Sequence, residues 1–185
     1  MADAEESNAV TFLKEQHDTI RDLFRSVASS SGDARRRAFE PLVRLLAVHE
    51  TAEEMVVYPA LKAHGDEARD VAEARIAEED QAKKKLTDLE RMNPDSSEFE
   101  ELFTEVRSAV EQHAASEERE VFPLLEAIRD EGQLRRMRAG LALAEGIAPT
   151  HPHKIAPESA IGNLAVGPFV AMVDRARDAI RAATS

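Results

Sequence analysis

One pattern of fifteen residues occurs twice in this chain, and it determines which side chains two of its helices present together. Residues 49–63 read HETAEEMVVYPALKA, and residues 113–127 read HAASEEREVFPLLEA, 64 positions later. Residues four apart lie on the same face of an α-helix. His49 is therefore placed beside Glu53, and His113 beside Glu117. Two imidazole–carboxylate pairs that face each other inside a helical bundle are the outline of a metal site.

The first 130 residues follow a helical pattern throughout. Glycine and proline are scarce there, and no alternating strand pattern occurs. We expect four helices joined by short loops, over about residues 8–28, 34–64, 67–92 and 97–130. The second helix starts either near residue 34 or at Pro41, which favours the first turn of a helix. These features predict an all-α protein, an up-down-up-down four-helix bundle.

Polar residues interrupt the inward faces of these helices. His17 is the one polar member of the stripe on the first helix, and the second helix carries His49 and Glu53 in its stripe. The stripe of the fourth helix continues from His113 and Glu117 to Leu124 and Ile128. A buried carboxylate without compensation costs several kcal/mol or shifts its pKa. A metal ion offsets this cost by accepting the lone pairs, so the three inward histidines and their glutamates predict metal binding.

The third helix has no histidine, so its ligand must be a carboxylate. Glu78, Glu79 and Asp80 are the candidates, and Glu79 falls near the middle of the apolar face at 100° per residue. We expect Glu79 to be the ligand. The alternative is that residues 78–80 form a solvated acidic run that is matched by solvated lysines at 83–85.

Several neighbouring residues have a less specific interpretation. The second glutamates of the repeats, Glu54 and Glu118, either support the site or face water, and water is the favoured reading. Tyr58 and Phe122 occupy equivalent positions and are expected to pack in the core, although Tyr58 has a hydroxyl that can donate to a metal-bound oxygen. The remaining histidines are expected to be solvated in loops: His64, His151 and His153.

Composition narrows the chemistry and the partners. The chain has no cysteine, so any metal is held by nitrogen and oxygen, which suits Fe, Mn or Zn. Its net charge of −12 disfavours binding to nucleic acid or to an anionic membrane surface. No membrane-spanning run or signal-peptide pattern occurs, so a cytoplasmic location is expected.

The chain changes character after residue 130. We expect a short helix over residues 133–145, a linker rich in proline and histidine, and an amphipathic helix over residues 166–182. The predicted division is a bundle domain at residues 1–130 and a C-terminal extension at residues 131–185. The last helix is expected to dock on its own bundle or on a protein partner.

The motifs HETAEE at 49–54, EED at 78–80 and HAASEE at 113–118, together with His17, resemble those of the hemerythrin-like, HHE cation-binding family over about residues 9–130. The resemblance implies a four-helix bundle around a non-heme pair of iron ions (Fe) bridged by an oxo or hydroxo group. It implies that Glu53 and Glu117 bridge the metals. The terminal nitrogen ligands would be His17, His49 and His113.

The chain departs from this family pattern on the third helix. Oxygen-carrying members place two histidines there, four residues apart, whereas this chain offers Glu79 and Asp80. A shell of three histidines and three carboxylates favours the harder ferric state. The expected function is therefore a di-iron protein that binds or reacts with O2, peroxide (H2O2) or nitric oxide (NO), as a sensor or protective redox protein rather than an O2 carrier.

Two other hypotheses belong to different classes. In the first, the metal only stabilises an interaction module that acts through the amphipathic helix at residues 166–182. In the second, the chain is a structural helical bundle whose His–Glu pairs are salt bridges without a metal. Iron analysis separates the last hypothesis from the others, and deletion of residues 147–185 separates the first two.

Overall fold

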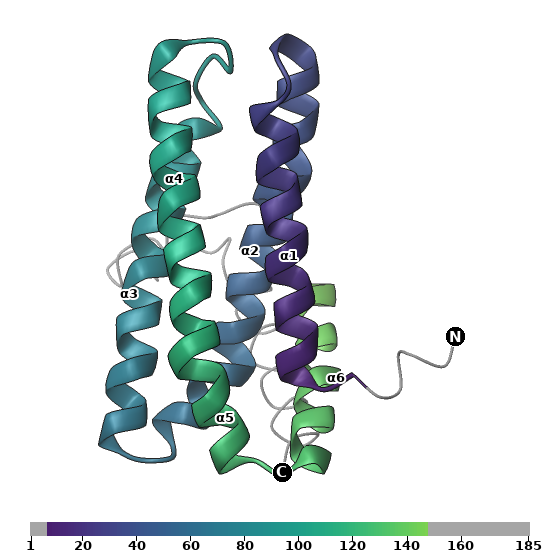
Figure 1. Cartoon of the computed structure of the whole chain (residues 1–185), viewed down its shortest axis with the longest axis vertical. Helices are drawn as coiled ribbons and strands as arrows, with labels where there is room; N and C mark the ends of the chain where they lie inside the picture. Colours follow the sequence, from purple (N-terminus) through teal and green to yellow (C-terminus); the bar gives the residue numbers. More distant parts are fainter. Residues whose placement is uncertain (1–6, 148–185) are drawn as a thin grey trace, which may run out of the picture.

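The computed structural model describes residues 7–147, and all regular structure in that range is helical. Four long segments run antiparallel: α1 (Ala9–Ala28), α2 (Gly32–Lys62), α3 (Asp66–Leu89) and α4 (Ser97–Ser116), as Figure 1 shows. The fourth continues through a π-helical turn, η1 (Glu117–Val121), into α5 (Phe122–Ile128). The expected all-α, up-down-up-down four-helix bundle is confirmed.

Local sequence signals account for the helix ends. The side chains of Asn8 and Ser96 accept hydrogen bonds from the backbone N–H groups of the first turns of α1 and α4. Helix α2 already begins at Gly32, whose φ of +55° suits glycine. Pro41 therefore lies inside α2 and does not start it, which decides between the two predicted starts in favour of the earlier one.

The buried apolar residues form two clusters, one toward each end of the bundle. One cluster contains Ile20 and Phe24 of α1 together with residues from α2, α3 and α4. The other contains Leu13 of α1 and Leu61 of α2 together with residues from α3, η1, α5 and α6. Between the two clusters the bundle interior is occupied by buried histidines and glutamates. Burial of apolar surface at both ends stabilises the fold around this polar layer.

The π-helical turn changes which residues of the fourth segment face inward. Leu124 was expected in the buried stripe, but it is only partly buried, and Leu125 is the fully buried residue. A π-turn adds one residue to the helical repeat, so the inward position seven residues after Glu117 moves to the eighth. Ile128 is likewise only partly buried.

Helix α6 (Glu131–Ile147) covers the expected short helix and packs against α1 and α2 (Figure 1). Its buried residues belong to the same hydrophobic cluster as Leu13 and Leu61: Leu134, Met137, Leu141 and Ala144. The expected linker and the amphipathic helix at residues 166–182 lie outside the described residues. The proposed division at residue 130 therefore stays a prediction.

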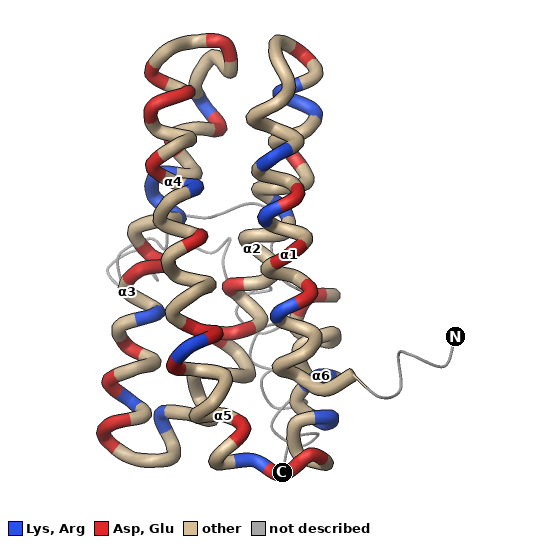
Figure 2. Tube along the Cα trace, in the orientation of Figure 1, with Lys and Arg blue, Asp and Glu red and all other residues tan. Residues whose placement is uncertain are grey.

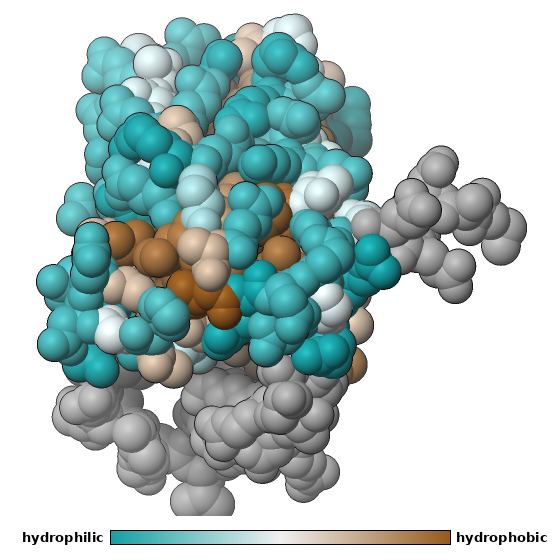
Figure 3. Space-filling model, turned by 60° about the horizontal axis from the view of Figure 1, so that its bottom comes forward, coloured by the Kyte–Doolittle hydropathy of each residue, from teal (hydrophilic) through white to brown (hydrophobic). Residues whose placement is uncertain are grey.

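Acidic and basic residues are both distributed along the length of the bundle (Figure 2). On the face drawn in Figure 3, a group of apolar residues lies between hydrophilic ones. Among the described residues, Leu143 is the large hydrophobic side chain that stands out as exposed. None of the helices between residues 7 and 147 combines the length and apolar character that a membrane crossing requires.

Candidate metal centre

The structure brings the six predicted ligands together in the middle of the bundle. One group of side chains offers ligand atoms that all lie within 4.8 Å of one another: His17, His49, Glu53 and Glu117. A second group meets the same criterion: Glu53, Glu79, His113 and Glu117. The two groups share Glu53 and Glu117, so the cluster has the form of two adjoining sites with two carboxylates in common.

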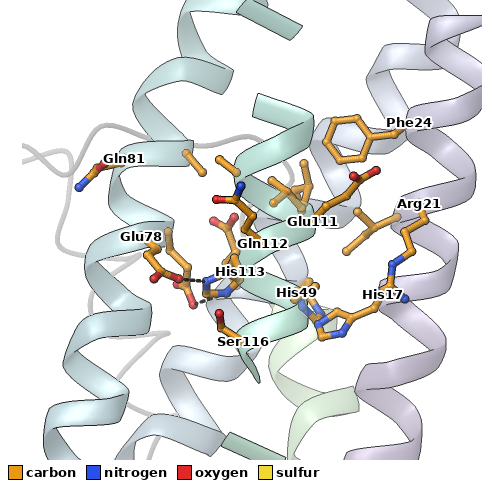
Figure 4. A pocket seen from close by; sticks show the side chains of 18 of the residues that line it. His17, Arg21, Phe24, His49, Glu78, Gln81, Glu111, Gln112, His113 and Ser116 are labelled. Atoms are coloured by element: carbon orange, nitrogen blue, oxygen red, sulfur yellow. Dashed lines mark hydrogen bonds and ion pairs between the residues drawn. The ribbon is translucent and has the colours of Figure 1, made fainter. Parts of the chain in front are cut away.

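Each segment of the bundle contributes to this cluster from its buried face. The Nε2 atom of His17 on α1 lies 3.3 Å from Oε2 of Glu117, and Nε2 of His113 on α4 lies 3.4 Å from the same oxygen. On α2, Nε2 of His49 lies 3.3 Å from Oε2 of Glu53, as expected for residues four apart. Figure 4 shows the rings of His17, His49 and His113 converging on one region between the helices.

The third helix contributes Glu79, as predicted. Glu79 is almost completely buried and belongs to the second group, whereas Asp80 belongs to neither. Glu78 lies at the edge of the cluster, where its carboxylate accepts from Nδ1 of His113. The solvated acidic run that was the alternative interpretation is therefore wrong for Glu79, whereas the side chain of Glu78 is 42% exposed.

Many polar atoms of the cluster have no hydrogen-bond partner in the described part of the chain. They include Nε2 of His17 and of His113, both carboxylate oxygens of Glu53, and Oε2 of Glu79 and of Glu117. Buried polar groups in folded proteins are nearly always paired, and these atoms are lone-pair donors of the kinds that bind iron, manganese or zinc. The cluster therefore fits a metal site chemically as well as geometrically.

The Nδ1 atom of each histidine contacts an acceptor on a different segment. His17 contacts Glu118 at 2.9 Å, and His113 contacts Glu78 at 3.0 Å. His49 contacts the side-chain oxygen of Gln16 at 2.8 Å. An acceptor at Nδ1 leaves the hydrogen on that nitrogen and the lone pair on Nε2, which is the arrangement that metal-binding histidines use.

Two sequence interpretations need correction at these positions. Glu118 was expected to face water, but it accepts from both His17 and Arg21, because π-turn η1 lies next to α1 at this level. Glu54 was given the same interpretation, and it forms an ion pair with Lys83. Lys83 was expected to be solvated, yet its side chain is only 18% exposed and its ammonium also lies 3.6 Å from Oε2 of Glu79.

Tyr58 has a larger role than core packing. Its ring is buried as expected, and its hydroxyl lies within hydrogen-bond distance of Glu79 and, at 2.7 Å, of Oε1 of Glu117, so it can donate its one hydrogen to either carboxylate. The equivalent residue of the second repeat, Phe122, is fully buried and stacks on the ring of His17 with centroids 5.6 Å apart. The two repeats therefore use the same position differently.

Burial and mutual repulsion shift the protonation of the cluster. Burial and the charges of neighbouring carboxylates hold the pKa of Glu53 and of Glu79 well above the usual range. Burial would raise the pKa of Glu117, but the close approach of His17 at 3.3 Å and the charges of the nearby histidines outweigh burial and lower this pKa to about 2. Burial together with the charge of His17 lowers the pKa of His49 to about 3. A bound cation would replace the protons that two of these carboxylates otherwise retain.

A cavity of about 280 Å³ adjoins the cluster and reaches all four long helices. His17, His49, His113 and Glu79 form part of its wall (Figure 4). Apolar residues also line it, among them Ile20, Phe24 and Val110. The buried carboxylate of Glu50, whose pKa is raised to about 8 by burial, also faces it.

The arrangement of this cluster has a counterpart among known proteins. The chain matches the model of the hemerythrin HHE cation binding domain over residues 8–125. It belongs to that family. It is 27% identical to an uncharacterised hemerythrin-like protein of Schizosaccharomyces pombe over 164 residues. This match covers 88% of this chain and 81% of the relative.

The fold of this hemerythrin-like chain is also similar to a crystal structure. That structure is of a hemerythrin HHE cation binding domain-containing protein from Mycobacterium kansasii. It has 26% sequence identity and a TM-score of 0.66, and the match covers 76% of this chain and 88% of the other. The family and the buried His/Glu cluster together indicate a metal site.

The sequence did not indicate three members of the hemerythrin-like site's surroundings. Gln16 precedes His17 by one residue, and Glu50 follows His49 by one, so neither falls on the stripe that marked the ligands. Lys83 lies four residues after Glu79 on the same face of α3, and that spacing was the available signal for it.

Proposed function

We propose that this hemerythrin-like chain binds two iron ions in the cluster and acts on O2, peroxide or nitric oxide as a sensor or protective redox protein. The ligands are three histidines and three carboxylates: His17, His49, Glu53, Glu79, His113 and Glu117. The observation that carries the proposal is the set of unpaired buried lone pairs in two groups that share Glu53 and Glu117. Manganese and zinc are the alternative ions for the same donors.

The donor set argues against reversible oxygen carriage. The two groups differ, because one has two histidines and two glutamates and the other has one histidine and three glutamates. Anionic oxygen donors favour harder, more oxidised metal ions, and the third helix adds Glu79 as such a donor. Iron in this environment would supply redox chemistry, and the protein would supply the orientation of the donors and a partly apolar pocket.

The residues around the cluster would hold the donors in place. Glu118 and Glu78 accept from the Nδ1 atoms of His17 and His113, and each of these carboxylates also pairs with an arginine, Arg21 or Arg75. Partners of this kind fix the tautomer and the ring orientation of a ligating histidine. Tyr58 supplies a hydroxyl hydrogen at Oε1 of Glu117, an oxygen of one of the shared carboxylates.

The cavity beside the cluster has room for a small ligand. Its volume of about 280 Å³ lies at the lower end of the range for small-molecule pockets. Its lining combines metal-donor side chains with apolar residues. O2, H2O2 and NO match this combination, because each is small and needs a metal more than it needs a set of hydrogen-bonding groups.

Anaerobic iron titration tests the proposal. We expect about two iron ions per chain, and new visible absorption bands when the loaded protein is exposed in separate samples to O2, H2O2 and NO. His113→Ala should lower the iron content, because it removes the only nitrogen donor of the second group. His64→Ala is the matched control, since His64 is an exposed histidine after the end of α2.

Each result bears on a different part of the proposal. Iron content that is unchanged in His113→Ala would contradict the assignment of the ligands. A protein that binds no iron would refute the metal assignment, and a loaded protein whose spectrum responds to none of the three molecules would refute the redox role. The expected cytoplasmic location stays a prediction.

A further inference from the structure

The three histidines of the cluster do not have the same kind of partner at Nδ1. His17 and His113 each contact a carboxylate, Glu118 and Glu78. His49 instead contacts the side-chain amide of Gln16. A carboxylate can only accept when ionised, whereas an amide has one end that accepts and one end that donates. Gln16 alone therefore does not determine whether Nδ1 of His49 carries a hydrogen.

A carboxylate from helix α6 removes this ambiguity. The Nε2 amide group of Gln16 donates to Oε1 of Glu145. Because Glu145 accepts, the NH2 end of Gln16 must face α6 and its oxygen must face α2. That oxygen lies 2.8 Å from Nδ1 of His49, so Nδ1 must carry the hydrogen. The lone pair of His49 is then on Nε2, the nitrogen beside Glu53.

We propose that Glu145 is a positioning residue for the metal centre, which acts through Gln16 to set the tautomer and orientation of His49. This inference rests on the proposed role of His49 as a metal ligand. Glu145 lies beyond residue 125, where the match to the family model ends. Helix α6 is thereby a functional part of the centre as well as a packing element on α1 and α2.

The proposal has a test that requires no metal. In metal-free protein with ¹⁵N-labelled histidine, NMR shifts of the ring nitrogens report which nitrogen of His49 carries the hydrogen. We expect the Nδ1–H tautomer in the wild type and a mixture of tautomers in Glu145→Gln, because glutamine can donate as well as accept. The Nε2–H tautomer in the wild type would overturn the proposal, even if the protein binds metal.

Metal affinity supplies the second test. Loss of an outer partner of a ligating histidine typically weakens metal binding about 10–100-fold, which is the effect expected for Gln16→Leu. Glu145→Gln acts one step further out and should weaken binding by about 3–10-fold, measured by competition with a chelator. Glu131→Gln is the matched control, since Glu131 is also an α6 carboxylate that accepts from a side-chain amide, that of Asn8, the N-cap residue of α1, at 3.2 Å. It should leave the affinity unchanged.

A double variant separates positioning from a general effect of α6. If Glu145 acts only through Gln16, then Glu145→Gln has no further effect on metal affinity in a Gln16→Leu background. An equal loss in both backgrounds would overturn the proposal, as would an equal loss in Glu131→Gln. Absence of metal binding in the wild type would refute the proposed function instead, while the tautomer measurement would still decide the role of Glu145.

Discussion

Tyr58→Phe is the sharpest perturbation of the cluster, because it removes one oxygen atom and leaves the buried ring in place. Phenylalanine already occupies the equivalent position of the second repeat, where Phe122 is fully buried. The variant is therefore expected to keep the scaffold. Its effect should come from the hydroxyl, which lies between the carboxylates of Glu79 and Glu117.

The magnitude follows from the number of hydrogens involved. A phenol has a single hydrogen, which can be donated to only one of the two carboxylates at any moment. The variant therefore loses the equivalent of one hydrogen bond to a charged acceptor. Such a bond contributes about 1.5–3 kcal/mol. For a chain of this length, 1 kcal/mol corresponds to roughly 2–4 °C in Tm. Metal-free Tyr58→Phe should therefore melt roughly 3–12 °C below the wild type.

The loss should also depend on pH. Donation from Tyr58 favours the ionised form of Glu79, so its removal raises the pKa of Glu79 further above the usual range. A carboxyl with a raised folded-state pKa costs stability increasingly as pH rises from its unfolded-state pKa to its folded-state pKa, and costs nothing at lower pH, where it is protonated in both states. The further rise in the pKa of Glu79 in Tyr58→Phe adds to this cost only at pH values above the wild-type pKa. The destabilisation by Tyr58→Phe should therefore be larger at pH 8 than at pH 5.5.

Urea denaturation of chelator-treated protein at pH 5.5 and at pH 8 measures the loss in free energy of unfolding and its dependence on pH. Thr87→Val is the matched control, because Thr87 is buried and its hydroxyl donates only to a neutral helix carbonyl, that of Lys83 at 2.8 Å. The control should cost about 0.5–1.5 kcal/mol at either pH. If Tyr58→Phe costs no more than Thr87→Val, or the same at both pH values, the hydroxyl does not stabilise ionised carboxylates and the reasoning is refuted.

Three further predictions use metal-free protein. Lys83→Met removes the ammonium that pairs with Glu50, Glu54 and Glu79. In urea denaturation at pH 9 it should destabilise the fold by about 3 kcal/mol, because a buried carboxylate is left without its cation. The cost should be smaller at pH 6, where Glu50, with a pKa of about 8, is protonated. Because the pKa of His49 is lowered from 6.5 to about 3, the unfolded chain takes up a proton below pH 6.5 that the folded chain refuses. The stability advantage of the wild type over His49→Ala should thus shrink by about 3 kcal/mol between pH 6.5 and pH 4, and an advantage that stays constant would contradict the shift. Leu141→Ala should lower the free energy of unfolding by about 3 kcal/mol in a single transition, because Leu141 of α6 is fully buried in the same hydrophobic cluster as residues of α1 and α2. A separate early transition would show that α6 unfolds independently.

The positions of the six predicted ligands could be inferred from the sequence because they depend only on helical periodicity. His17 lies within the apolar stripe of α1, and Glu79 lies on the axis of the apolar face of α3, so each helix determines its own inward residue. No knowledge of the neighbouring helices was needed for that step. The bundle could be predicted as well, because helices joined by short loops pack as antiparallel neighbours.

The partners of those ligands depend on information that one helix does not contain. Gln16 and Glu118 are adjacent in sequence to ligands, but their contacts cross to other segments, α2 for Gln16 and α1 for Glu118. The π-turn was missed for a similar reason. Both repeats carry a proline at the same place, yet α2 runs through Pro59 without interruption while η1 precedes Pro123. The motif therefore does not by itself specify the turn that shifts the inward position to Leu125.

The charges of the cluster would favour metal binding in this hemerythrin-like bundle. Three buried carboxylates lie together in the polar layer of the bundle: Glu53, Glu79 and Glu117. Among the described residues, the one ammonium within 4 Å of any of them is that of Lys83, which pairs with Glu79 and also with Glu50 and Glu54. Without a metal, Glu53 and Glu79 reduce the repulsion by retaining protons, which is the meaning of their raised pKa values. Metal binding must release those protons. The raised pKa values of Glu53 and Glu79 therefore cost the metal-free fold more stability as pH rises above the usual carboxyl range, and a bound metal would offset this cost.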